Sequence, residues 1–161
     1  MGFDQIKPYE PITIISWMYD FAFNKVDLID NRAQQVPCYH PGYTFVEKMQ
    51  AISSKFRKEQ KEGVFSPNFL RHYYDLYQLL DSSVVTKFIG TKEYNTHKEK
   101  RFGQSNIKNI TQNQAFLLED SKTFGQYQKQ YEASSTLYYQ KTSTPSFDEI
   151  ISRLREWAPK L

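Results

Sequence analysis

Apolar residues that recur at helical spacing constrain the fold of this chain more than any other feature of its sequence. The first clear stripe consists of Phe45, Met49, Ile52 and Phe56. A second stripe runs from Phe69 to Leu80. Such spacing places the side chains on one face of a helix, and that face has to be buried against other helices. The sequence therefore predicts a mainly α-helical fold after residue 41.

Capping residues predict where the first two of these helices begin and end. Thr44-x-x-Glu47 matches a capping box, in which a hydroxyl and a carboxylate satisfy free backbone amides at a helix start. The helix that it predicts ends at Gly63, because glycine is favoured directly after a helix. Ser66-Pro67 then places a capping residue and a proline at the start of the next helix.

The rest of the chain predicts three more helices. One is expected from about Ser83, with Val84, Val85, Phe88 and Ile89 pointing inward. A helix end and a loop are expected over the polar residues 90–111, and a long helix over residues 113–131. Ser146-x-x-Glu149 is a second capping box, and Pro159 ends the helix that it predicts.

The first 41 residues carry a weaker pattern. Residues 33–40 predict an extended strand, which Pro37 restricts to a sheet edge or a bulge because proline donates no backbone hydrogen bond. Residues 12–24 form an apolar run that begins with β-branched residues and continues at helical spacing, so its type stays open. No hairpin partner for the strand is evident, and so few strands do not make a stable sheet.

The basic residues are concentrated in the middle of the chain. Residues 46–108 contain 12 Lys and Arg against 7 Asp and Glu, whereas the net charge of the whole chain is only +3. A basic segment of this kind suits a ligand that carries phosphate groups. It equally suits a solvated helix surface, so charge alone leaves both interpretations open.

No run of about 18 apolar residues, the length that a membrane-spanning helix needs, occurs in the sequence. The first residues are acidic and contain two prolines, unlike a secretory leader. Cys38 is the single cysteine, which excludes an internal disulfide. We therefore expect a cytoplasmic protein without a membrane anchor.

One group of residues suggests chemistry. Gly-rich phosphate loops, H-E-x-x-H and G-x-S-x-G are all absent from the sequence. Lys48 lies on the first predicted helix and Asp75 on the second, with Arg71 and His72 one turn before Asp75. If the two helices are antiparallel neighbours, the lysine could neutralise phosphate while the aspartate orients the attacking group or a metal.

A plain structural role explains the same residues equally well. In that case Lys48 is solvent-exposed, Asp75 pairs only with Arg71, and Glu47 is a helix cap and nothing more. The spacing of these residues does not decide between the two interpretations.

Two stretches around these residues resemble the C-terminal part of a known toxin family. Residues 42–52 (GYTFVEKMQAI) are followed by residues 71–80 (RHYYDLYQLL). They are similar to the P-x-x-T-F-x-E-K and R-(H/D)-x-x-D-L-Y-x-L patterns of AbiEii/AbiGii-type nucleotidyltransferase toxins, the toxin halves of abortive-infection and type IV toxin–antitoxin pairs. The closing region from Tyr131 to Leu154 is also similar, and residues 8–12 with the strand up to Pro41 fit the stretch that joins the two lobes of the family. The resemblance therefore covers nearly the whole chain.

The resemblance implies a fold and a reaction. Residues 42–161 would form a helical, bundle-like C-terminal lobe of a polymerase β-like nucleotidyltransferase, and residues 1–41 would be a remnant of its sheet domain and the connector. The reaction implied is nucleotidyl transfer from a nucleoside triphosphate to an acceptor such as the end of a tRNA. Lys48 and Asp75 would be the catalytic residues, and the substrate-binding residues would be Lys55, Arg71 and His72.

The family also has a Gly-Ser turn for the nucleotide phosphates and a D-x-D pair for Mg²⁺, and neither motif occurs in these 161 residues. Mg²⁺ is thus expected for the full family enzyme, while no metal ligand is assigned in this chain. We expect the chain by itself to transfer no nucleotide. The alternative is a non-catalytic helical interaction module that binds a cognate antitoxin or a second copy, so that the protein is a monomer or a homodimer.

Overall fold

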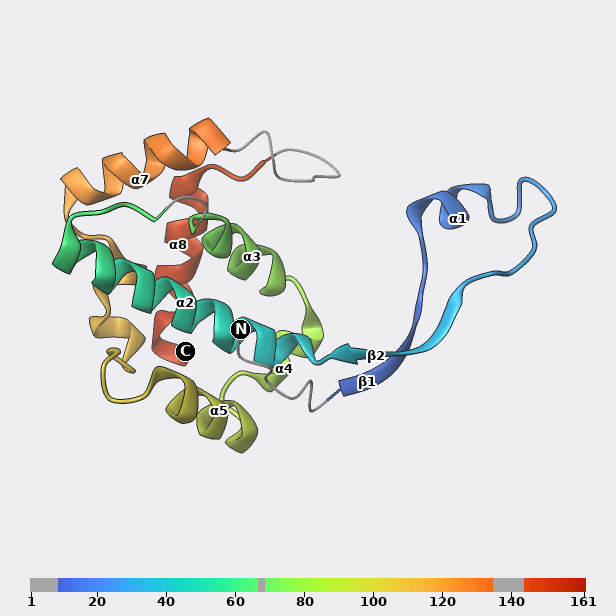
Figure 1. Cartoon of the computed structure of the whole chain (residues 1–161), viewed down its shortest axis with the longest axis horizontal. Coiled ribbons are helices and arrows are strands. Elements are labelled where there is room, and N and C mark those ends of the chain that lie inside the picture. Colours follow the sequence, from blue (N-terminus) through green and yellow to red (C-terminus); the bar gives the residue numbers. More distant parts are fainter. Residues whose placement is uncertain (1–8, 67–68, 135–143) are drawn as a thin grey trace. The chain divides into compact units, whose positions relative to one another are not determined.

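The computed structural model describes residues 9–66, 69–134 and 144–161. The chain divides into two compact units, Met1–His40 and Pro41–Leu161 (Figure 1). The first unit contains a small antiparallel sheet, and the second is built from helices. The prediction of a mainly helical fold with a small α+β part at the N-terminus is confirmed.

The first unit is a β-hairpin with a helix between its strands. Strand β1 (Tyr9–Ile14) pairs with β2 (Ala33–Tyr39), and helix α1 (Trp17–Ala22) lies between them in sequence. The strand expected over residues 33–40 is confirmed, but the expectation that it lacks a hairpin partner is wrong. The apolar run over residues 12–24 divides at Ser16, whose side chain accepts a hydrogen bond from the backbone N–H of Tyr19 and so starts α1.

Two prolines face each other in the middle of this hairpin. Pro11 lies opposite Pro37, and the register shifts between Ile12 and Ile14. Neither proline can donate a backbone hydrogen bond. The two residues must therefore form a non-hydrogen-bonded pair, in which the backbone nitrogen atoms point away from the partner strand. Prolines at such positions remove the outward donors of both edges, which limits pairing with further strands.

Helix α2 (Pro41–Glu62) is the longest element of the second unit. It begins three residues before Thr44, so the capping box predicted at Thr44 and Glu47 is wrong and both residues lie inside the helix. Pro41 is favoured at the first helical position because the N–H that it lacks is unpaired there in any residue. The predicted end is confirmed, since Gly63 follows the helix with a φ of +68°.

Helix α3 (Arg71–Leu79) starts later than the Ser66-Pro67 pattern predicts, because Phe69 and Leu70 form a turn and are buried. Pro67 itself lies outside the described residues. Helix α4 (Ser83–Phe88) follows as expected, although Val84 is exposed rather than inward.

The loop expected over residues 90–111 is in large part helix α5 (Lys92–Phe102), so this prediction is wrong. The Thr91 side chain accepts a hydrogen bond from the backbone N–H of Tyr94 at the start of α5. Gly103, with a φ of +57°, ends the helix.

The long helix predicted over residues 113–131 is also interrupted. Asn113 caps helix α6 (Gln114–Leu117), and Leu118 adopts a left-handed conformation before α7 (Ser121–Ser134) begins. A 3₁₀ turn, η1 (Ile110–Gln112), precedes α6.

The last helix agrees with its prediction. Both hydrogen bonds of the Ser146–Glu149 capping box are present at the start of α8 (Phe147–Trp157). The apolar stripe of this helix predicts five inward side chains, of which Phe147, Ile150, Ile151 and Leu154 are buried and Trp157 is partly buried. Pro159 lies in a closing 3₁₀ turn, η3 (Ala158–Lys160).

One hydrophobic core holds the second unit together. Helix α2 packs against α3 on one side and α5 on the other, and it also contacts α4 and α6 (Figure 1). Helix α8 packs against α3, α6 and α7. Among the described residues, no helix is long and apolar enough to cross a membrane.

The buried face of α3 supplies a test of this core. Leu76 is fully buried, so Leu76→Ala should lower the free energy of unfolding by about 2–5 kcal/mol through the cavity that it leaves. Val84, which is 45% exposed, supplies the control: Val84→Ala should change the free energy by less than about 0.5 kcal/mol. Urea titrations followed by circular dichroism measure both, and equal losses would contradict this assignment of the buried face.

Candidate active site

Helices α2 and α3 bring Lys48 and Asp75 into direct contact. The Lys48 Nζ atom donates a hydrogen bond to Asp75 Oδ2 at 2.6 Å, and the two side chains are 28% and 33% exposed. The alternatives in which Lys48 is merely solvent-exposed and Asp75 pairs only with Arg71 are therefore wrong. The pair is half-buried, so its charges are held in place and a ligand can still reach them from solvent.

His72 completes this group from the turn of α3 that precedes Asp75. Its Nδ1 atom lies 3.4 Å from Lys48 Nζ and 3.7 Å from Asp75 Oδ2, and its side chain is only 12% exposed. A lysine ammonium has three N–H donors. Asp75 takes one of them and His72 lies within reach of a second, which leaves a third for a ligand.

The surroundings of Asp75 lower the pKa of its carboxyl group. Burial alone would raise this pKa, but the nearby His72 ring and the hydrogen bond from the Lys48 ammonium outweigh that effect. The carboxylate is thus charged at neutral pH and is a weak base. It is suited to orienting Lys48 and accepting hydrogen bonds, and poorly suited to holding a proton.

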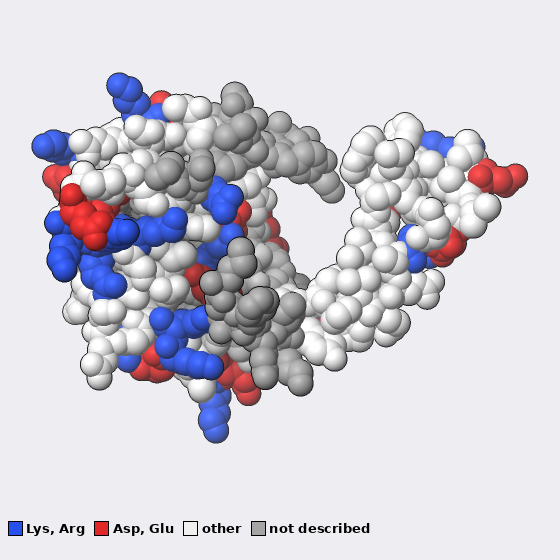
Figure 2. Space-filling view, viewed as in Figure 1, with Lys and Arg blue, Asp and Glu red and all other residues white. Residues whose placement is uncertain are grey.

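The other two residues predicted to bind substrate lie on the same two helices. Arg71 is exposed at the start of α3 and has no ion-pair partner among the residues that the structure describes. Lys55, further along α2, donates a hydrogen bond to the Ser66 side chain at 3.3 Å. Figure 2 shows basic side chains gathered along the C-terminal half of α2, where Lys55, Arg57, Lys58 and Lys61 follow one another.

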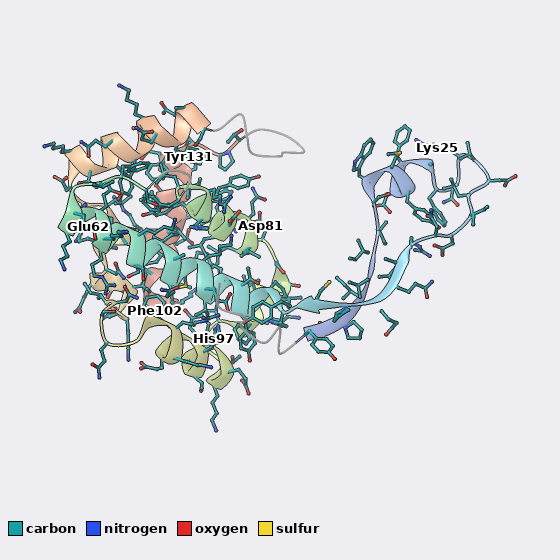
Figure 3. The ribbon with its side chains drawn as sticks, viewed as in Figure 1. Lys25, Glu62, Asp81, His97, Phe102 and Tyr131 are labelled. Carbon is teal, nitrogen blue, oxygen red and sulfur yellow. The ribbon has the colours of Figure 1, made fainter. Side chains whose placement is uncertain are left out.

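A second charged group on the other side of α2 was missed by the sequence analysis. Glu47 binds Arg101 of α5, and its Oε1 atom also lies 3.5 Å from Nε2 of His97. In Figure 3 His97 lies between α5 and α2. Burial lowers the pKa of His97 against the opposing effect of Glu47, so Arg101 and not His97 balances the Glu47 charge at neutral pH.

Two signals in the sequence could have revealed this group. Thr91 is a favourable capping residue, and Gly103 follows Lys100 and Arg101, the basic residues expected at a helix end. Together they define α5. The group was missed because the polar composition of residues 90–111 suggested a loop.

The sequence of the chain matches the model of a known family. The family model described as "Nucleotidyl transferase AbiEii toxin, Type IV TA system" matches residues 1–153. The chain therefore belongs to this family of nucleotidyltransferase toxins, as the resemblance of its helix motifs predicts. No curated protein and no solved structure matches the chain.

Mg²⁺, which the family resemblance implies, does not fit the residues around Asp75. Over the described parts of the chain, no three His, Cys, Asp or Glu side chains lie close enough together to hold a metal ion. The Asp75 oxygen that faces His72 also accepts the hydrogen bond from the Lys48 ammonium. Mg²⁺ needs several oxygen ligands in octahedral geometry, so we assign no catalytic step through a metal at this pair.

The lowered pKa of Asp75 gives a test of the pair. Its contribution to stability should be present above the ordinary pKa of 3.8 and should disappear as the pH falls through the lowered folded-state value. Lys48→Gln removes the ammonium group whose hydrogen bond and positive charge lower this pKa, so carboxyl NMR titration should show a higher pKa for Asp75 in the variant. Lys122→Gln on α7 is the control, and a pKa that is unchanged in Lys48→Gln would show that Lys48 does not hold the carboxylate.

Proposed function

We propose that the helical unit binds the phosphate groups of a nucleoside triphosphate at Lys48 and positions them for nucleotidyl transfer to a nucleic-acid acceptor. The observation that supports this most directly is the Lys48–Asp75 hydrogen bond of 2.6 Å between two helices. Membership of the nucleotidyltransferase toxin family supports the reaction class. The family resemblance suggests the end of a tRNA as the acceptor and a cognate antitoxin as a protein partner.

In this reaction the acceptor hydroxyl oxygen attacks the α-phosphorus of the nucleotide. A bond forms between that oxygen and the phosphorus, the bond from the α-phosphorus to the bridging oxygen breaks, and pyrophosphate leaves while the hydroxyl loses its proton. Negative charge shifts toward the pyrophosphate as the bond breaks. A positioned ammonium group stabilises that charge, which is the role that we propose for Lys48.

Asp75 and His72 would act by positioning. Asp75 fixes the orientation of the Lys48 ammonium group. The lysine side chain therefore loses little conformational entropy when it binds the phosphate. The His72 Nδ1 atom lies 3.4 Å from Lys48 Nζ, so the His72 ring limits the directions that the ammonium group can take. Arg71 is exposed beside them and can add a two-pronged contact with a phosphate group.

This proposal concerns the binding and positioning part of the reaction. Lys48 supplies one positive charge, whereas family members also use Mg²⁺ held by a D-x-D pair, a motif that this sequence lacks. We therefore propose that the chain by itself binds nucleotides without transferring them.

Calorimetric titration with each of the four nucleoside triphosphates tests the binding site. We expect the parent chain to bind at least one of them. Lys48→Gln should weaken this binding by about 10- to 150-fold, since one lost contact between a charged group and a phosphate costs about 1.5–3 kcal/mol. Lys122→Gln on α7 is the matched control. Equal affinities in the parent and in Lys48→Gln would contradict the proposed site.

One observation favours the second candidate function, an interaction module. Among the described residues, the exposed large hydrophobic side chains gather in the first unit, where Trp17 is 72% exposed, Phe21 67% and Ile29 90%. No described residue of the first unit is buried. A two-stranded hairpin without a buried core is marginally stable by itself, so a partner that covers these side chains would stabilise it.

Light scattering after size-exclusion chromatography tests whether that partner is a second copy. If it is, the parent chain should form a dimer and the double variant Trp17→Ser/Phe21→Ser should be a monomer. Val64→Ser is the control, because Val64 is 67% exposed in the second unit. A parent chain that stays monomeric at high concentration would exclude self-association through this surface.

A further inference from the structure

We propose a second ligand site on the α5 side of α2, in a pocket that takes a nucleoside phosphate. The pocket has a volume of about 300 Å³ and is lined by Tyr43, Lys92, Glu93, Thr96, His97 and Lys100. Tyr43 comes from the first turn of α2, and the other residues come from α5. Lys48 and Asp75 lie on the α3 side of α2, so this pocket is a different site. The inference draws its ligand class in part from the proposed function.

An aromatic ring forms one wall of the pocket and is held in place by its neighbours. The Tyr43 ring lies 4.9 Å from the Phe88 ring and 4.7 Å from the His97 ring, measured between ring centres. These contacts reduce the freedom of the tyrosine, so a planar ligand could pack on it at a low cost in entropy. Nucleobases pack on aromatic rings in this way whatever their sequence.

Two lysines line the pocket against a single carboxylate among its described residues, so they give the lining a net positive charge. Lys92 and Lys100 are both exposed, and within the described part of the chain neither has an ion-pair partner. Lys58, by contrast, pairs with Glu62. The two free lysines are eight residues apart on α5, which is about 12 Å along the helix. They can therefore approach a phosphate from either end of the pocket.

The remaining polar groups favour a nucleotide over a simple anion. Glu93 carries a negative charge that would repel inorganic phosphate, but its carboxylate can accept hydrogen bonds from ribose hydroxyl or base amino groups. Thr96 adds a hydroxyl that can donate or accept. Glu93 is the one carboxylate among the described residues that line the pocket, since Glu47 is not part of the lining and pairs with Arg101.

A nucleoside phosphate could come from two sources, a free nucleotide or one unit of a single-stranded RNA. Either source presents a base for Tyr43 and a phosphate for the lysines. An RNA strand would place its acceptor end on one side of α2 while a nucleoside triphosphate occupies the Lys48 side. The experiment below therefore has one arm for each source.

The double variant Lys92→Gln/Lys100→Gln tests the site, with Lys122→Gln/Lys129→Gln on α7 as the matched control. Adenosine monophosphate and a fluorescently labelled single-stranded oligoribonucleotide are titrated into each protein. We expect the affinity for at least one probe to fall about tenfold in the first double variant and to stay unchanged in the control. For the oligonucleotide, the slope of log affinity against log salt should become shallower by about 1.4, which corresponds to two lost phosphate contacts.

The two probes distinguish the two sources of the ligand. Loss confined to the oligonucleotide assigns the pocket to a nucleic acid, and loss confined to the monophosphate assigns it to a free nucleotide. Unchanged affinity for both probes would overturn the proposal. Tyr43→Leu gives a second measurement, in which base packing should be lost while the lysines stay in place.

Lys48→Gln separates this proposal from the proposed function. In the parent chain, NMR shifts of the Thr96 and His97 amides should report binding in this pocket, and the Asp75 amide should report binding at the other site. The shifts at Thr96 and His97 should persist in Lys48→Gln. If they disappear in that variant while Lys92→Gln/Lys100→Gln retains them, the pocket is not a separate site and the proposal fails.

Discussion

The second unit depends on how the single long helix α2 is buried. Its apolar stripe, with Phe45, Met49 and Ile52 fully buried, forms the centre of the core. Successive residues of a helix are turned by about 100°, so the charged residues beside such a stripe must point toward different neighbours. Glu47 therefore meets α5, and Lys48, the next residue, meets α3. The two proposed ligand sites therefore lie on different sides of α2, one toward α5 and one toward α3.

Two ion pairs of the second unit join elements that lie far apart in sequence. Lys48 binds Asp75 from α2 to α3, and Arg153 of α8 binds Asp81. Arg153 also donates a hydrogen bond to the backbone carbonyl of Tyr77 at the end of α3. Partly exposed pairs of this kind add little stability, because water solvates the separated charges well. Their effect is to set which polar groups face each other once the apolar core has formed.

The two units satisfy the demands of folding in different ways. The helical unit buries large aromatic side chains, and the Tyr73 hydroxyl inside it donates a hydrogen bond to the Ala115 carbonyl at 2.7 Å. The hairpin unit relies on backbone pairing and leaves side chains such as Trp17 exposed. The family match extends over residues of both units.

Sequence alone determined those features that depend on contacts between near neighbours in the chain. The apolar stripes predicted helices α2, α3 and α8, Gly63 predicted the end of α2, and the Ser146–Glu149 capping box predicted the start of α8. The family motifs pointed to Lys48 and Asp75. The capping box predicted at Thr44 is wrong because α2 already begins at Pro41. Helix α5 was missed because most of its residues are polar.

Only the tertiary structure decided which residues meet across the chain. The hairpin, the break at Leu118 and the contacts between Lys48 and Asp75 and between Glu47 and Arg101 each depend on how separate elements pack. A periodic pattern shows which face of a helix is buried, but it does not show which other helix covers that face. The polar residues at the edges of the stripe acquire their partners, and with them their chemistry, from that packing.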